Sequence, residues 1–524
     1  MAKTNGNFYK KSLQLAFISI LCQTVNLVRD VFLAKSLGAS NLNDIYLISQ
    51  STISMFVSMV NSPLATAYVP VTTEYFVSKD KRERNKFISK VYGDIFILSL
   101  AIMVISYLFI NPITQMVAPG YEGSDKIILI KMILLQMPIV SINMLRGINR
   151  GNFQILQKYN ISEVTNVIPY CVMVLYLIIF NVNSNIYIIG IILTVTTFIS
   201  IIPELIILRK NGVEFKMSIG ITNDIKIMIK MMLATIIVTA VREVNVVTDK
   251  AFGSMLEEGS VTMLSYGSKI TVVFVSLVST AISVVGFTDI ARLKNQNDKK
   301  GVLNIIEKSS NIINLIIIPL AFYLIVFSND VIKILFERGN FTSAQTNITA
   351  NIMRCYAIGL LGYGFQDVFT RALHAYKIVR CTIKASIIMV IINIILDFLF
   401  FKSIGSYGIA LASSLAILCV IPMLSRDVIR YIGKFSIKLI VSEIIKIVAA
   451  SVVATISVIF IKKLLIDNFM TFIILSILYM IIYFIICIIL KVNIFKEIKA
   501  DTGADDPVCL GKETGIYQPC YSSG

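Results

Sequence analysis

The sequence has 524 residues, of which 56% are hydrophobic and only 15% are charged, whereas an average soluble domain carries about 25% charged residues. With a mean hydropathy of +0.80, the apolar surface is too large to be buried inside one soluble protein, so a lipid bilayer is the expected solvent. The formal net charge of +17 does not indicate nucleic-acid binding, because Lys and Arg fall mostly in short loops between apolar runs.

The chain consists of consecutive apolar runs, each close to or above the roughly 20 residues that a helix needs to cross the hydrocarbon core. We therefore expect an all-α polytopic membrane protein with fourteen transmembrane helices. The runs lie at residues 12–37, 43–77, 88–110, 126–156, 161–181, 185–208, 221–250, 260–291, 304–336, 344–375, 380–402, 406–430, 436–461 and 468–490.

Basic residues alternate between the loops that connect these runs. Segments 79–86 and 292–300 are rich in Lys and Arg, whereas segment 111–124 contains neither, and Lys462 with Lys463 is the exception to the pattern. Because cytoplasmic loops carry the excess of basic residues, we expect a multi-pass protein of the bacterial cytoplasmic membrane with both termini in the cytoplasm.

An internal repeat is visible at an offset of 219 residues. The sequence VNLVRD at 25–30 recurs as VNVVTD at 244–249, and the same offset places Gly120 on Gly339. Transporters are commonly built from duplicated bundles, so the repeat predicts two six-helix lobes in parallel orientation.

The repeat sets the expected domain boundaries. The N-lobe covers residues 1–215, the C-lobe covers 216–433, and helices 13 and 14 follow in 434–499. Residues 500–524 are polar and contain two cysteines, which is typical of a cytoplasmic tail or of an artificial extension.

Charged residues inside the apolar runs are the main indication of function, because a charge at the bilayer centre costs at least about 2.5–3.5 kcal/mol on insertion scales. Such residues either tie helices together as ion pairs or line an aqueous cavity, and both interpretations remain open for each residue. A cationic cavity between the paired first and seventh helices would suit an anionic substrate, since Arg binds phosphate through two hydrogen bonds. The charged residues are Arg29, Asp30, Arg242, Glu243, Asp249, Lys269, Arg354, Asp367, Arg371 and Asp397.

Asn393 and Asp397 form a second candidate site. They are four residues apart and therefore share one helix face, where an amide oxygen and a carboxylate offer hard ligands for a small cation. Ser413 on the next helix could add another oxygen. The alternative interpretation is an Asn–Asp pair that bonds to a neighbouring helix. With one histidine in the chain, neither a zinc cofactor nor histidine-based catalysis is expected.

Several short segments resemble the MurJ (MviN) family of bacterial lipid II flippases, within the superfamily of multidrug and polysaccharide exporters. The likeness extends from residue 10 to about residue 490, and the fourteen helices and two lobes of that family match the expected architecture. The segments are VRD at 28–30, LGAS at 37–40, ATAYVP at 65–70, APGY at 118–121, SYGSK at 265–269, LFERGNFT at 335–342 and GIALASS at 408–414.

The resemblance implies a central cationic cavity that binds a pyrophosphate-linked lipid, with Arg29, Asp30, Asp44 and Lys269 in the matching positions. Some members resemble sodium-coupled carriers, and the matching ligand positions are Asp249, Asn393, Asp397 and Ser413.

The chain also departs from the family pattern. Gln23 stands where better-known members have an arginine, and the second-helix arginine is missing from the stretch FVS at 56–58. Arg242, which lies 219 residues after Gln23, is a candidate for the compensating charge.

We therefore expect a flippase, not an enzyme, that moves an undecaprenyl-pyrophosphate-linked peptidoglycan precursor to the outer leaflet by alternating access. Its expected partners are the lipid-linked oligosaccharide and membrane lipids, with cell-wall synthesis enzymes as a further candidate. No cofactor is expected apart from Na⁺ as a coupling ion. The alternatives are a flippase for a capsular or teichoic-type glycan, a cation-coupled drug exporter, and a membrane scaffold.

Overall fold

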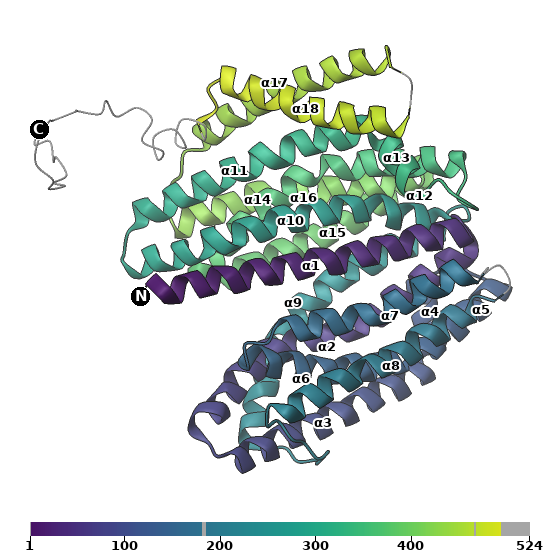
Figure 1. Cartoon of the computed structure of the whole chain (residues 1–524), viewed down its shortest axis with the longest axis vertical. Coiled ribbons are helices and arrows are strands. Elements are labelled where there is room, and N and C mark those ends of the chain that lie inside the picture. The colour runs from purple at the N-terminus through teal and green to yellow at the C-terminus, as the bar shows by residue number, and fades with distance from the viewer. Residues whose placement is uncertain (1, 181–184, 466–467, 494–524) are drawn as a thin grey trace, which may run out of the picture.

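The computed structural model describes residues 2–180, 185–465 and 468–493, and every regular element in these ranges is an α-helix. The long helices lie side by side with roughly parallel axes (Figure 1), as expected for a chain whose backbone must satisfy its own hydrogen bonds in lipid. The helices are α1 (Ala2–Leu37), α2 (Asn41–Ser78), α3 (Lys81–Leu108), α4 (Ile110–Val117), α5 (Gly123–Gln136), α6 (Pro138–Ile155), α7 (Asn160–Ile179), α8 (Tyr187–Lys210), α9 (Asn223–Ser254), α10 (Ser260–Asn295), α11 (Lys299–Val326), α12 (Ser328–Phe336), α13 (Ser343–Ile358), α14 (Leu360–Ala375), α15 (Val379–Ile404), α16 (Ser406–Tyr431), α17 (Ile437–Lys462) and α18 (Phe469–Ile489).

The number of membrane crossings follows from these elements. Within the described ranges, ten crossings are long and apolar enough to span a bilayer, with α5 and α6 counted as one. Pro138 begins α6 and lacks the N–H that would continue the helix from α5. Four more polar crossings, namely α2, α9, α10 and the pair α13–α14, run alongside the others. Together they give the fourteen crossings expected from the sequence.

The helices repeat at the predicted offset. Asn41 and Ser260 begin α2 and α10, and Tyr187 and Ser406 begin α8 and α16, in each case 219 residues apart. The short α4 and α12 end at equivalent positions as well. α4 occupies much of segment 111–124, where the sequence predicts a loop, so that prediction is wrong there. α12 lies inside the predicted run 304–336. The predicted run 304–336 is therefore two helices, because the chain leaves helical geometry at Phe327.

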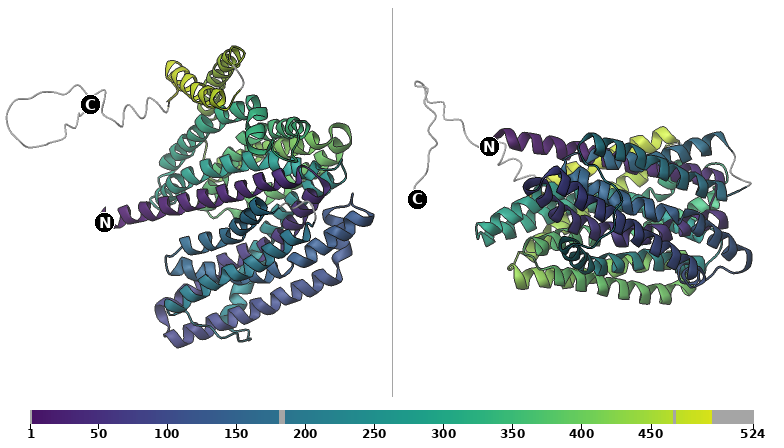
Figure 2. Two further views of the ribbon diagram at one scale, coloured as in Figure 1. Left: turned by 45° about the vertical axis from the view of Figure 1, so that its right-hand side comes forward. Right: turned by 90° about the horizontal axis from the view of Figure 1, so that it is seen from below.

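Two lobes are evident in Figure 1, where the N-lobe helices α2–α8 fill the lower part and α10–α16 fill the upper part. The helices α1 and α9 lie between them. α1 contacts α7 of its own lobe and α10 of the other lobe, while α9 contacts α15 and α2 in the equivalent way. The left view of Figure 2 shows α1 between the lobes from a further side. The domain boundaries at residues 215, 433 and 499 stay predictions, and the predicted tail at 500–524 lies outside the described residues.

The helices α17 and α18 form a separate pair at the outer edge of the C-lobe (Figure 1). They have their own buried cluster, which includes Tyr479 and Tyr483. The hydroxyl groups of these tyrosines donate hydrogen bonds to the carbonyl oxygens of Pro319 and Leu315 in α11, both at 2.8 Å. The pair is therefore anchored to the bundle by specific polar contacts as well as by apolar packing.

Candidate transport site

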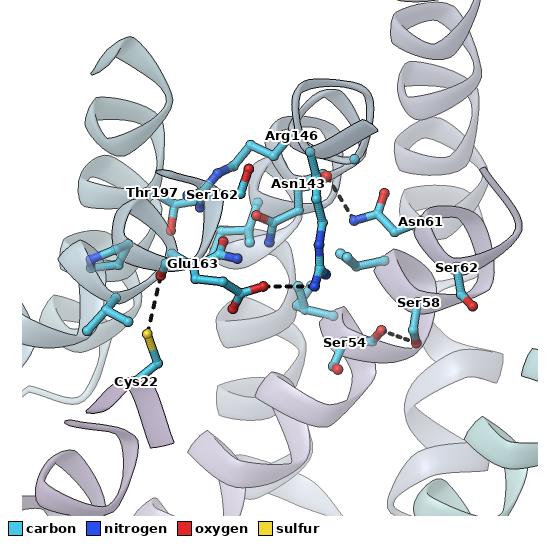
Figure 3. A pocket seen from close by; sticks show the side chains of 18 of the residues that line it. Cys22, Ser54, Ser58, Asn61, Ser62, Asn143, Arg146, Ser162, Glu163 and Thr197 are labelled. Atoms are coloured by element: carbon cyan, nitrogen blue, oxygen red, sulfur yellow. Dashed lines mark hydrogen bonds and ion pairs between the residues drawn. The ribbon is translucent and has the colours of Figure 1, made fainter. Parts of the chain in front are cut away.

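A cavity of about 780 Å³ lies within the N-lobe, lined by residues of α1, α2, α6, α7 and α8 (Figure 3). This volume is within the usual range of small-molecule sites. Serine, asparagine, glutamine and threonine side chains make up much of its lining. Its four charged lining residues are Arg146, Arg150, Glu163 and Glu204.

Arg146 and Glu204 neutralise each other in a buried hydrogen-bond network. Both Nε and Nη2 of Arg146 donate to Oε1 of Glu204, at 3.0 and 2.9 Å. Asn149 donates to the other carboxylate oxygen at 2.7 Å, and Thr165 also donates to Oε1. The side chains of Arg146 and Glu204 are only 7% and 1% exposed. A buried pair with its hydrogen bonds satisfied holds helices in place, so we assign Arg146 and Glu204 to joining α6 and α8.

The other two charges remain accessible. Nη2 of Arg150 donates to Oε1 of Glu163 at 2.8 Å, and this contact joins α6 to α7 in the cavity lining. The Arg150 side chain is 63% exposed and that of Glu163 is 22% exposed. Exposed pairs of this kind contribute only about 0.2–1 kcal/mol, so a ligand could replace either partner.

Arg29, Asp30 and Lys269, predicted from the sequence to act together, are brought into one cluster. Arg29 Nη2 lies 2.7 Å from Oδ1 of Asp30, and Lys269 donates to the other oxygen, Oδ2. Asp30 is 1% exposed. The Arg29 guanidinium also lies over the Tyr170 ring, 4.7 Å from its centroid, and Tyr170 lines the cavity. The cluster therefore adjoins the cavity across one aromatic ring.

Asp44 has a different position, at the end of the bundle where α1 finishes. Its Oδ2 accepts the N–H of Gly259 at 2.9 Å, and its Oδ1 accepts the N–H and hydroxyl of Thr262 at 2.7 and 2.5 Å. A carboxylate at the start of α10 satisfies free N–H groups of that helix. Asp44 of the N-lobe thus caps a C-lobe helix and holds the lobes together here.

The same end is closed by two equivalent glycine contacts. Gly339 lies directly against the Lys35 carbonyl at the end of α1, and Gly120 lies against the Ser254 carbonyl at the end of α9. Each pair is related to the other by the 219-residue offset. The N–H of Asn340 donates to the Lys35 carbonyl oxygen at 3.0 Å. We call this arrangement of 35–44, 118–121, 254–262 and 337–342 the closed end.

Tyr121 in the loop before α5 belongs to the closed end. Its side chain is half-buried, and burial, with the nearby carboxylate of Asp44, raises the pKa of its hydroxyl above the ordinary value. The hydroxyl is therefore neutral at physiological pH and adds no charge to the closed end.

Arg242 is not brought together with the other predicted cations. It is exposed on α9, it does not line the cavity, and it makes no hydrogen bond or ion pair among the residues that the structure describes. Its compensation for Gln23 stays a prediction.

The four predicted sodium ligands form a cluster in the C-lobe with α9. Ser413 donates to Oδ2 of Asp249 at 3.0 Å, and the Asn393 amide donates to Ser413 at 3.3 Å. Asp397 is fully buried. The oxygens Oδ1 of Asp249, Oδ1 of Asn393 and both carboxylate oxygens of Asp397 have no hydrogen-bond donor within the described part of the chain. Buried carboxylates without donors are costly, and such a set of hard oxygens fits a small cation.

Sequence reasoning missed five charged residues that shape the N-lobe and the seam between the lobes. Arg146 and Arg150 are four residues apart on one face of an expected helix, and Glu204 follows a proline inside an apolar run, so the signal was present. Lys250 donates to the Leu47 carbonyl at 2.8 Å across the lobes. Its role depends on the fold and could not be inferred from its neighbours in sequence. The missed residues are Arg146, Arg150, Glu163, Glu204 and Lys250.

The fold and the cavity define a class of protein. A duplicated helical bundle with a polar internal cavity, closed at one end by contacts between its lobes, is the architecture of a secondary transporter. Among solved structures, the bundle matches a chain described as "Lipid II flippase MurJ, inward closed conformation" with a TM-score of 0.79 and 25% identity, over 92% of this chain and all of that one. An inward-facing multidrug MATE transporter matches with a TM-score of 0.67 over 79% of this chain and 98% of that one, at 12% identity, which shows the fold alone.

Sequence comparisons agree. The family model "Lipid II flippase MurJ" matches residues 33–480. A lipid II flippase MurJ of Thermosipho africanus is 27% identical over 414 residues, which cover 77% of this chain and 82% of that protein. A probable lipid II flippase MurJ of Rickettsia prowazekii is 23% identical over 417 residues, covering 78% and 81%. The chain belongs to the lipid II flippase MurJ family.

Proposed function

We propose that this protein translocates lipid II, the undecaprenyl-pyrophosphate-linked peptidoglycan precursor, from the inner to the outer leaflet of the cytoplasmic membrane. The observation that carries the proposal is a polar cavity inside a duplicated bundle of the MurJ family, sealed at the closed end by contacts between the lobes. Such a seal is needed only if the cavity is reached from one side at a time. Transport, and not covalent chemistry, is the task that this arrangement supports.

The orientation of the proposed cycle follows from the loops. The basic segments 79–86 and 292–300 lie at the end opposite the closed end, and the excess of basic residues favours a cytoplasmic position for them and for both termini. The described conformation then corresponds to an inward-facing state. The headgroup enters from the cytoplasm, and rupture of the Asp44 and glycine contacts opens the other side.

In this proposal Arg29 and Lys269 attract the pyrophosphate while Asp30 holds both cations in place. The cluster carries one net positive charge, which makes it tolerable when empty and attractive to an anion. Arg242, exposed on α9, supplies a further positive charge at the seam once the lobes rearrange.

Rescue of a strain depleted of its own lipid II flippase tests the function. The full chain is expected to restore growth, and Arg29→Ala with Lys269→Ala is expected to abolish the rescue at equal membrane abundance. A membrane scaffold for cell-wall enzymes would tolerate these cavity substitutions, and retention of full rescue would favour it. Purified capsular or teichoic-type lipid-linked precursors are supplied in proteoliposomes in place of lipid II. Faster translocation of one of these precursors than of lipid II would favour a flippase for that glycan.

We also propose that Asp249, Asn393, Asp397 and Ser413 bind Na⁺ as the coupling ion. A ligand at a hundredfold excess over its dissociation constant stabilises the folded protein by about 2.7 kcal/mol. The melting temperature of the purified protein should therefore be higher in NaCl than in KCl at equal ionic strength, and Asp397→Ala should remove the difference. Equal melting temperatures in the two salts would exclude this site.

A further inference from the structure

The two cavity arginines, Arg146 and Arg150, lie one helical turn apart on α6 but have unequal surroundings. Arg146 is bound by Glu204 and Thr165 and is almost fully buried. Arg150 has one ion-pair partner, Glu163, among the described residues, and it uses a single N–H group for that contact. A guanidinium has five donors, so Arg150 keeps the capacity to bind an anion through two parallel hydrogen bonds.

The position of Arg150 places it at the mouth of the cavity. It lies five residues before Ile155, where α6 ends at the basic end of the bundle, and Glu163 lies three residues after the start of α7. Tyr170 is seven residues further along α7, which is about 10 Å deeper at 1.5 Å per residue. The Arg29 guanidinium lies over the ring of Tyr170 in a cation–π contact. A ligand that enters from the basic end therefore meets Arg150 first and the Arg29 cluster second.

The charges of the cavity indicate that a ligand can replace Glu163 as the ion-pair partner of Arg150. With Arg146 neutralised by Glu204, Arg150 and Glu163 are the two cavity charges that a ligand can reach. Glu163 keeps Arg150 neutralised while the cavity is empty, and their exposed contact is weak. A phosphate group accepts both forked N–H donors of an arginine, and it would displace the carboxylate.

We propose that Arg150 is a first phosphate-binding station of this transporter, at which the lipid-linked pyrophosphate replaces Glu163 before it passes Tyr170 to reach Arg29. This inference rests on the proposed function and assigns a new residue to it. It also places a substrate contact on α6. Such a contact would supply positive charge that α1 and α2 lack at Gln23 and in the neutral stretch 56–58.

The test measures the initial rate of translocation in proteoliposomes of neutral phosphatidylcholine as the mole fraction of lipid II is varied. Loss of a forked charged contact is expected to raise the apparent KM of Arg150→Gln about ten- to hundredfold, with kcat changed less than KM. Arg150→Lys, which keeps the charge and loses the fork, should give an intermediate KM. Arg380→Gln, which removes an exposed arginine at the same end of the bundle, is the matched control and should leave KM unchanged.

Glu163→Gln separates the proposal from a structural role. Removal of the competing carboxylate should lower the apparent KM severalfold, whereas loss of a merely structural ion pair would not improve binding. An unchanged KM for Arg150→Gln, or a raised KM for Glu163→Gln, would overturn the proposal. When phosphatidylglycerol is added to the proteoliposomes, the wild type should keep its low apparent KM, and the difference from Arg150→Gln should remain. If phosphatidylglycerol abolishes the difference between the variant and the wild type, the site binds bulk anionic headgroups and the proposal is wrong.

A binding measurement distinguishes this inference from the proposed function. The full chain in phosphatidylcholine nanodiscs is titrated with inorganic pyrophosphate by calorimetry, with sodium chloride maintaining ionic strength. If the wild type moves no lipid II, the proposed function fails, and weaker pyrophosphate binding by Arg150→Gln still supports the station. If the wild type moves lipid II, and Arg150→Gln and Glu163→Gln both match it in transport and in pyrophosphate binding, the proposed function holds. The assignment of Arg150 as a phosphate-binding station is then wrong.

Discussion

At the scale of single residues, the molecule uses its buried charges in three different ways. Arg146 and Glu204 neutralise each other while Nε and Nη2 of Arg146 both donate to the carboxylate, which is a structural use. Asp30 is shared between two cations, which leaves a net positive charge beside the cavity. Asp397 has no donor among the described residues. The arrangement of partners, more than the residue type, therefore decides which charge is available to a ligand.

Asp30→Asn tests the shared carboxylate. Removal of one partner from a buried ion pair typically costs about 3–5 kcal/mol, because Arg29 and Lys269 would be left facing each other. We expect a clear fall in the melting temperature of the purified protein, with partial recovery in the double variant Asp30→Asn with Lys269→Met. The exposed Asp80→Asn is the control, with a change within about 0.5 kcal/mol. Equal stability of Asp30→Asn and the control would contradict the cluster.

At the scale of elements, the 219-residue repeat links local sequence to the closed end. Gly339 has a left-handed backbone, with φ of +60°, and it touches the end of α1. Gly123 has a similar φ of +54° and no neighbour within 4 Å of an added Cβ. Substitution of either glycine by a residue with a side chain would therefore strain the backbone. Only at Gly339 would the new side chain also collide with the other lobe.

Gly339→Ala should open the closed end, because the new methyl group would collide with the Lys35 carbonyl. Gly123→Ala should leave it closed, although both substitutions carry the cost of a left-handed alanine, roughly 1–2 kcal/mol. Spin labels on the ends of α1 and α12 would report the distance between the lobes. We expect a longer distance in Gly339→Ala alone. An increase of the same size in Gly123→Ala would contradict a role of the Gly339 contact in closing this end.

Much of the element scale could be predicted from the sequence, and most of the site could not. Apolar runs and loop charges predict the crossings because each depends on local composition. The division at Phe327 was missed because no proline or glycine marks the break, although the polar residues Ser328, Asn329 and Asp330 follow it directly. The grouping of Arg29, Asp30 and Lys269 was expected from a resemblance. The burial of Arg146 and the exposure of Arg150 depend on which helices pack around α6, which spacing along the chain does not determine.

At the scale of the whole molecule, the polar cavity is lined by α1 and N-lobe helices, whereas Asp249, Asn393 and Ser413 are joined by hydrogen bonds between α9 and C-lobe helices. The lobes meet at the closed end through Asp44, the glycine contacts and Asn340. Transport by alternating access requires these contacts to break in every cycle. A ligand cannot shift the lobes without binding one arrangement better than the other, and the proposed phosphate and Na⁺ sites supply that difference.

The most direct test locks the closed end. In a background without the native cysteines, Lys35→Cys and Asn340→Cys place a thiol on each side of the contact, and lipid II translocation is measured in proteoliposomes before and after oxidation. Translocation should stop when the disulfide forms and return after reduction, with each single-cysteine variant unaffected. Undiminished translocation by the fully cross-linked protein would contradict transport by alternating access.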